Sequence, residues 1–247
     1  MRSLWVILNL IVSVILIAIP ILLVGYFDKG KKMTAALSRF WGKWVLWSTG
    51  VKCEIEGLEN LDEKGQYIFM SNHSSALDII LGVTLLPYNL VFLAKKELFI
   101  IPIFGWAMVA AGMIRIDRGN PEKAKVSVNK ASKTLSASSF STLMYPEGTR
   151  SKSGELLPFK KGGFIMAIQS GLSIVPITII GAGNILPKGA FRIQPGCVKI
   201  IISDPLKTED LSLNDKNHLL ESCRNMIHTT LDLHEGASPV KTKLHIA

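Results

Sequence analysis

The chain has 247 residues, of which 48% are hydrophobic and 19% are charged, and this balance excludes a disordered or collagen-like protein. Its 28 basic and 19 acidic residues give a formal net charge of +9, which favours an anionic partner. The positive mean hydropathy of +0.33 favours an anionic bilayer over nucleic acid as that partner.

The N-terminal run from Leu4 to Phe27 carries no charge and reaches the ~20 residues that a helix needs to cross hydrocarbon. Pro20 would kink this helix, so a spanning helix and a re-entrant one both remain open. A cleaved signal peptide is disfavoured because the run is too long and has no small-x-small cleavage site. The basic residues are concentrated after the run, which predicts a cell-membrane protein with its body on the cytoplasmic side.

Apolar residues then recur at three- and four-residue steps, which predicts an amphipathic helix with Met33, Leu37, Phe40, Trp41, Trp44 and Val45 on its apolar face. Together with Trp47, the tryptophans suit the headgroup layer of a bilayer. The alternative is a core helix of the soluble domain. We therefore predict a membrane anchor over residues 1–50, with bilayer contact through residues 4–47.

From Val51 the pattern changes to short apolar runs that alternate with longer helical stretches. Strands are predicted at Val51–Ile55, Tyr67–Met70, Leu90–Ala94, Ile114–Ile116, Thr142–Tyr145, Ile174–Ile180 and Val198–Ile202. Helices are predicted from Pro121 after an Asn120 cap, over Lys161–Gln169 with Gly171 as a left-handed cap, and over Asn214–Leu233.

This alternation predicts an α/β domain over residues 51–235, with a largely parallel central sheet and a site on loops that leave the strand ends. A short polar tail is expected at 236–247.

The first polar turn after a predicted strand contains His73 and Asp78, followed by an apolar helix. On a regular helix these residues would point about 140° apart, so they pair only if His73 lies in the turn and Asp78 in the first turns of the helix. Asp78 would then hold one imidazole nitrogen and leave the other as a general base for a hydroxyl. Such a spacing also arises by chance, so this pair alone is weak.

A second polar turn follows the strand at 142–145 and carries Glu147, Gly148, Thr149 and Arg150. The Arg150 guanidinium suits phosphate oxygens, and Glu147 could accept hydrogen bonds from substrate hydroxyls or position the neighbouring backbone. A surface salt bridge that closes the loop is the alternative. Lys95, Lys96, Arg115 and Arg118 lie at other strand ends, where they either meet the same phosphate or are solvated. Lys160 and Lys161 are further candidates for phosphate contact.

Several common site patterns are absent from the sequence: G-x-S-x-G, GxxxxGK, GxGxxG and HExxH. No covalent serine, nucleotide, cofactor or metal is therefore predicted. The three cysteines are widely spaced and indicate neither a disulfide framework nor a metal site. The expected chemistry is activation of the substrate's own hydroxyl by His73, with no acyl-enzyme.

Four blocks in order resemble the glycerolipid acyltransferase family, in particular the bacterial 1-acyl-sn-glycerol-3-phosphate acyltransferases. They are Asn72-His73-x4-Asp78, Gly112–Arg118, Tyr145–Ser151 and Ile174–Ile177. The resemblance implies that His73 and Asp78 activate the hydroxyl of lysophosphatidic acid, which attacks the thioester of acyl-CoA or acyl carrier protein to give phosphatidic acid.

The resemblance also implies roles for the remaining residues and for the N-terminus. Arg118 and Arg150, joined by Lys95, would hold the acceptor phosphate; Glu147, Gly148 and Thr149 would shape its site; and Pro176 would border the donor side. An N-terminal helical hairpin in one leaflet of a bacterial inner membrane is implied as well. The alternatives are another acceptor, such as glycerol 3-phosphate or another lysophospholipid, a non-catalytic membrane-binding protein, and a lipid hydrolase.

Overall fold

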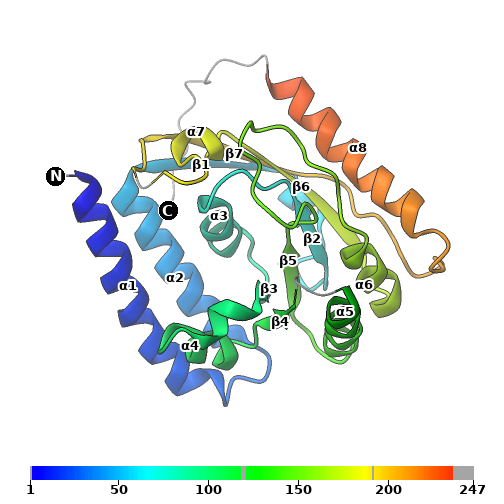
Figure 1. Ribbon diagram of the computed structural model, residues 1–247, viewed down its shortest axis with the longest axis horizontal. Coiled ribbons are helices and arrows are strands. Elements are labelled where there is room, and N and C mark those ends of the chain that lie inside the picture. The colour runs from blue at the N-terminus through cyan, green and yellow to red at the C-terminus, as the bar shows by residue number, and fades with distance from the viewer. Residues whose placement is uncertain (1, 118–120, 191, 236–247) are drawn as a thin grey trace.

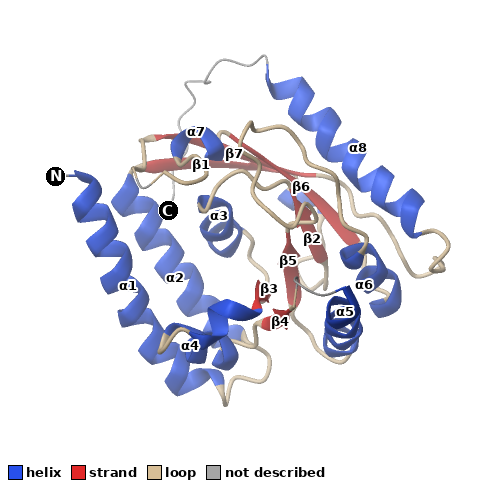
Figure 2. Ribbon diagram, in the orientation of Figure 1, coloured by secondary structure: helices blue, strands red, loops and turns tan. Residues whose placement is uncertain are grey.

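The computed structural model describes residues 2–117, 121–190 and 192–235, which form a seven-stranded sheet with helices on both faces (Figure 1). The strand order is β1-β7-β6-β2-β5-β3-β4, shown in red in Figure 2. The strands are β1 (Val51–Glu56), β2 (Ile68–Ser71), β3 (Leu90–Lys95), β4 (Ile114–Ile116), β5 (Ser141–Met144), β6 (Ile174–Ile180) and β7 (Gly196–Ile202).

Every pair of neighbouring strands runs parallel except β6 and β7. The central strand β2 pairs with β5 through Met70 and Met144, and with β6 through Ser71 and Ile177. All four residues of β2 are buried, as expected for a parallel strand covered on both faces. The loops that follow β2 and β5 therefore leave the sheet side by side, at the same edge.

The two faces of the sheet carry separate hydrophobic clusters, because successive strand residues point to opposite faces. Phe69 of β2 lies in the cluster covered by α2 (Lys32–Thr49) and α3 (Leu77–Leu85). Ile68 and Met70 lie in the other cluster, to which α5 (Pro121–Ser136), α6 (Gly162–Ser170) and α8 (Lys216–Glu235) contribute buried side chains. Shorter helical segments are η1 (Leu58–Asn60), η2 (Lys96–Ile100), α4 (Phe104–Ala110) and α7 (Ala182–Ile185).

The N-terminal run forms the helix α1 (Arg2–Gly25), which packs against α2 and α4 (Figure 1). Trp41 of α2 donates its indole N–H to Ser13 of α1 at 3.0 Å. The Lys31 ammonium donates to the carbonyl oxygens of Gly25 and Ala110, so one side chain ties the ends of α1 and α4 together. Among the described residues, no helix is both long enough and apolar enough to cross a membrane.

Helix α2 packs against the domain through a face that does not include its most exposed aromatic residues. Thr34, Ala35 and Gly42 are buried, whereas Phe40 is 60% exposed and Trp47 is 79% exposed. The reason is close helix packing: a Cβ atom at Gly42 would lie 2.0 Å from the hydroxyl oxygen of Thr84 on α3. Thr34, Ala35 and Gly42 therefore allow a close approach to the domain, while Phe40 and Trp47 face outward.

The predicted strands all occur, with ends that differ by at most two residues. Gly171 ends α6 in the left-handed region at φ 68°, as predicted. The last helix begins at Lys216, two residues after the predicted start. The Asn120 cap and the tail at 236–247 lie outside the described residues.

Candidate active site

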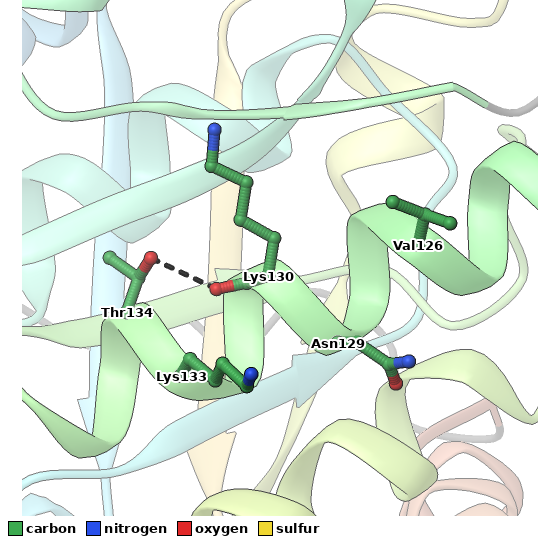
Figure 3. A pocket seen from close by; sticks show the side chains of 5 residues that line it. All are labelled: Val126, Asn129, Lys130, Lys133 and Thr134. Atoms are coloured by element: carbon green, nitrogen blue, oxygen red, sulfur yellow. Dashed lines mark hydrogen bonds between the residues drawn. The ribbon is translucent and has the colours of Figure 1, made fainter.

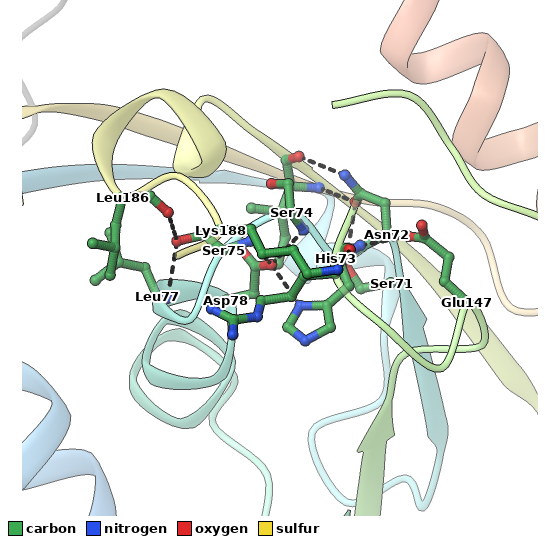
Figure 4. A network of polar contacts seen from close by, with 12 residues as sticks. Ser71, Asn72, His73, Ser74, Ser75, Leu77, Asp78, Glu147, Leu186 and Lys188 are labelled. Atoms are coloured by element: carbon green, nitrogen blue, oxygen red, sulfur yellow. Dashed lines mark hydrogen bonds and ion pairs between the residues drawn. The ribbon is translucent and has the colours of Figure 1, made fainter. Parts of the chain in front are cut away.

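The loop after β2 brings His73 and Asp78 together, with the Nδ1 atom of His73 2.8 Å from the Oδ2 atom of Asp78 (Figure 4). Asp78 lies in the first turn of α3 and is completely buried, while the His73 side chain is 13% exposed. The backbone N–H groups of Ser74 and Ser75 donate to the same oxygen at 2.9 and 2.8 Å. The pairing predicted from the spacing is therefore confirmed.

This pairing fixes the tautomer of the His73 imidazole. An ionised carboxylate only accepts hydrogen bonds, so the Nδ1 atom of His73 carries the proton that faces Asp78. The Nε2 atom is then left with its lone pair and can accept a proton from a substrate. The side-chain oxygen of Ser75 accepts the N–H of Leu77, the first residue of α3, at 3.1 Å.

The loop after β5 holds the backbone of His73 at both of its polar groups. The His73 N–H donates to Oε1 of Glu147 at 2.6 Å, and the Ser151 N–H donates to the His73 carbonyl at 2.7 Å. The other carboxylate oxygen of Glu147 accepts the N–H of Leu157 at 3.1 Å. Through Glu147 and Ser151 the loop thus positions the backbone of the histidine.

Glu147 is 3% exposed, and burial raises the pKa of its carboxyl to about 7, although the two backbone N–H donors act in the opposite direction. Both carboxylate oxygens already accept backbone N–H groups. Of the two roles that the sequence allowed, the geometry therefore favours positioning of the backbone over a contact with a substrate hydroxyl.

Tyr145 lies directly against the His73 ring. The two ring centroids are 4.0 Å apart and the planes are inclined by 16°, which is a stacked arrangement. Burial raises the pKa of the tyrosine hydroxyl well above its usual value. The ring of His73 is thus fixed by Asp78 at its edge and by Tyr145 on its face.

A third segment, from the end of β6 to Lys188, closes the other side of the turn. The Asn72 side-chain amide exchanges two hydrogen bonds with the backbone of Ile179, each of 2.8 Å. The Ser75 hydroxyl donates to the Leu186 carbonyl at 2.8 Å. The turn that carries the imidazole is therefore bound to β6 and to the segment that follows it.

The remaining predicted residues of the second loop lie beside the histidine. Gly148 has φ 72°, a conformation that favours glycine, and a Cβ atom there would lie 2.9 Å from the Lys160 side chain. Thr149 and Arg150 follow it, and Ser151 contacts His73 as described. The loop after β5 therefore brings the backbone of Arg150 close to the turn that carries the predicted base.

Lys95 and Pro176 lie apart from these contacts. Lys95 ends β3, and its exposed ammonium is 3.7 Å from Glu97. Pro176 is buried within β6, where it pairs with Met70 of β2. Arg118 lies outside the described residues.

Sequence reasoning missed four residues that this site uses: Asn72, Ser75, Tyr145 and Lys188. Asn72 and Tyr145 fall inside motifs that were recognised, so their position beside the key residues could have drawn attention to them. Lys188 is 110 residues or more from the histidine turn, and no local pattern marks it.

A hollow of about 480 Å³ lies elsewhere, on α5, between Val126, Asn129, Lys130, Lys133 and Thr134 (Figure 3). None of these residues takes part in the hydrogen bonds around His73. The candidate active site therefore lies at the loops after β2 and β5 and not at this hollow.

Comparisons with family models and with individual proteins indicate the same family. A family model described as acyltransferase matches residues 52–180. The chain is 37% identical to a 1-acyl-sn-glycerol-3-phosphate acyltransferase of Cocos nucifera, over 82% of this chain and 64% of that protein. It is 33% identical to one of Saccharomyces cerevisiae, over 74% of this chain and 60% of that protein. The chain thus spans less than two thirds of the length of these relatives.

A solved structure has the same fold. The crystal structure of the 1-acyl-sn-glycerophosphate acyltransferase PlsC from Thermotoga maritima matches 96% of each chain with a TM-score of 0.83, at 23% sequence identity. The predicted α/β architecture with a largely parallel sheet is confirmed by this match and by the strand pairing.

Proposed function

Because the chain belongs to the acyltransferase family, we propose that it transfers an acyl chain from a thioester donor to the free hydroxyl of 1-acyl-glycerol 3-phosphate, giving phosphatidic acid. The observation that carries the proposal is the 2.8 Å pair of His73 and Asp78, set in a turn that two other segments hold in place. The names of the relatives support the acceptor.

The reaction follows from the orientation of the imidazole. The Nε2 atom of His73 takes the proton of the acceptor hydroxyl while the oxygen attacks the thioester carbonyl carbon. The imidazolium that forms is stabilised by the Asp78 carboxylate. The tetrahedral intermediate then collapses, the C–S bond breaks, and the imidazolium returns the proton to the leaving thiolate. No covalent acyl-enzyme is formed.

We assign binding of the acceptor phosphate to cationic residues near this base. Arg150 lies one residue before Ser151, whose N–H binds the His73 carbonyl, so its backbone lies close to the base. Its fork-shaped guanidinium suits the phosphate oxygens. Lys95 and Arg118 remain further candidates from the resemblance. Glycerol 3-phosphate or another lysophospholipid would fit the same chemistry, and acceptor kinetics decide between them.

The donor is acyl-CoA or acyl carrier protein, and the acceptor is drawn from a bilayer. Support for bilayer contact comes from outward-facing apolar side chains on the N-terminal helices and the turn between them, such as Leu23, Phe27 and Trp47, which are 68%, 87% and 79% exposed. The basic residues that follow α1 support a catalytic domain on the cytoplasmic side of a cell membrane.

The test is a thiol-release assay with lysophosphatidic acid and each donor in turn. We expect His73→Ala to lower kcat by about 10²- to 10⁴-fold, because the general base is lost. His228→Ala is a matched control, since His228 and Asp232 form an exposed pair of the same 2.8 Å length on α8. Near wild-type turnover in His73→Ala, or no lysolipid-dependent thiol release by the wild type, would reject the proposed function.

A further inference from the structure

Lys188 joins the segment after β6 to the loop after β5 at a point beside the base. Its ammonium donates to the Arg150 carbonyl at 2.6 Å and to the Thr149 hydroxyl at 3.2 Å. Figure 4 shows Lys188 within the same network of polar contacts as His73, Asp78 and Glu147.

The segment that carries Lys188 is firmly attached to the histidine turn. Leu186, two residues earlier, accepts the Ser75 hydroxyl at 2.8 Å. A Cβ atom at Gly183 would lie 3.2 Å from the Ser74 side chain, so the backbone of α7 lies against the turn. The position of the ammonium relative to His73 is therefore set by short contacts on both sides.

The charge of Lys188 has no counter-charge in this network. Both of its acceptors are neutral oxygens, and among the described residues no carboxylate lies within ion-pair distance of Lys188 or of Arg150. An ammonium has three N–H donors, of which two are used here. Lys188 and Arg150 are linked through the Arg150 carbonyl, and one N–H of the ammonium remains unused. Together the two cationic residues form a binding site for an anionic group.

We propose that Lys188 is a second phosphate contact for the acceptor and determines specificity for phosphate-bearing acceptors. This inference rests on the proposed function. The ammonium of Lys188 donates to the Arg150 carbonyl and to the Thr149 hydroxyl, and directs its third donor to the same phosphate that the guanidinium binds. The two cations differ in role, because the guanidinium offers a planar fork whereas the ammonium offers a compact point charge.

The experiment compares Lys188→Gln and Lys188→Arg with Lys152→Gln, an exposed lysine two residues after Arg150. Steady-state kinetics are measured for lysophosphatidic acid and for the donor. Neutral 1-acylglycerol is assayed as an acceptor or, where it is not turned over, as a competitive inhibitor.

Loss of one charged hydrogen bond predicts a drop of about tenfold to a hundredfold in kcat/KM for lysophosphatidic acid in Lys188→Gln. The donor KM and the affinity for 1-acylglycerol stay at wild-type values, Lys188→Arg recovers most of the loss, and Lys152→Gln matches the wild type.

An equal loss of affinity for both acceptors would show that Lys188 only supports the loop and would overturn the inference. Wild-type kinetics in Lys188→Gln, or no recovery in Lys188→Arg, would overturn it as well. These outcomes are separate from failure of the proposed function, in which the wild type itself transfers no acyl chain to lysophosphatidic acid.

Discussion

At the scale of single residues, the imidazole of His73 is fixed by contacts that serve different purposes. The Asp78 carboxylate sets the tautomer, Glu147 and Ser151 hold the backbone, and Tyr145 covers one ring face. Three of these four partners come from one loop, which also carries Arg150. The base and the predicted phosphate contact are therefore aligned by the same short segment.

The stacking contact predicts a difference between two substitutions of Tyr145. Tyr145→Phe keeps the ring on His73 and removes a hydroxyl that is buried without a hydrogen-bond partner among the described residues, so activity is retained. Tyr145→Leu loses the stacked pair, and kcat falls by about two- to tenfold. Steady-state kinetics of both variants test this prediction. An equal change of kcat in Tyr145→Phe and Tyr145→Leu would contradict a positioning role of the Tyr145 ring.

The raised pKa of Glu147 predicts a pH dependence of stability. Because this pKa rises from 4.5 to about 7 on folding, the folded state binds more protons between these values, and the contribution of Glu147 to stability falls as the pH rises. Glu147→Gln does not titrate, although it loses a backbone hydrogen bond. Its deficit in unfolding free energy relative to wild type should therefore shrink from pH 4.5 to pH 7, by roughly 2 kcal/mol.

Urea unfolding at pH 4.5 and at pH 7.5 measures this change. Glu155→Gln, an exposed position of the same loop, is the control and should show no such trend. A deficit of Glu147→Gln that grows with pH would contradict the raised pKa.

At the scale of elements, α1, α2 and α4 form one packed group whose outer surface is apolar. Ala18 and Ile21 of α1 pack against Ala107 and Ala110 of α4. Because most of these contacting side chains are small, the large apolar side chains lie outside the contact. In the segment that covers η2 and α4, Ile100 is 80% exposed and Trp106 is 58% exposed. Large apolar side chains on the surface are typical of a contact with membrane or protein.

This surface predicts a contribution of η2 and α4 to vesicle binding. The double substitution of Ile100 and Trp106 by serine should weaken co-sedimentation with anionic phospholipid vesicles by about tenfold or more, because two large apolar side chains no longer leave water. Val126→Ser on α5, where the side chain is 68% exposed, is the control. Equal binding of the double variant and the wild type would show that the N-terminal helices alone make the contact.

At the scale of the whole molecule, the site exists because β5, β2 and β6 are neighbours in the sheet. The loops after β2 and β5 and the segment after β6 leave the same edge, which brings His73, Glu147 and Lys188 into one network. Residues 74 positions apart in the chain thereby share a 2.6 Å hydrogen bond. A parallel sheet gathers strand ends in this way whatever the distance along the sequence.

Local sequence patterns were sufficient to predict many of the strands, helix ends and side-chain pairs of this protein. Runs of apolar residues placed the strands, Gly171 marked a helix end, and the pairing of His73 with Asp78 followed from a turn that leads into a helix. Each of these depends on residues within about one turn or one strand of each other, where backbone geometry limits the choices. The pairing of the two candidate catalytic residues could therefore be predicted before the structure was known.

Tertiary structure decided which distant groups meet. The carboxylate of Glu147 binds the backbone of His73, the ring of Tyr145 covers its imidazole, and Lys188 binds the carbonyl of Arg150. It also set the close approach of α2 to α3, where a Cβ atom at Gly42 would lie 2.0 Å from the hydroxyl oxygen of Thr84. These contacts depend on strand order and on the space between elements, which arise from packing of the whole chain and leave no periodic trace in the sequence.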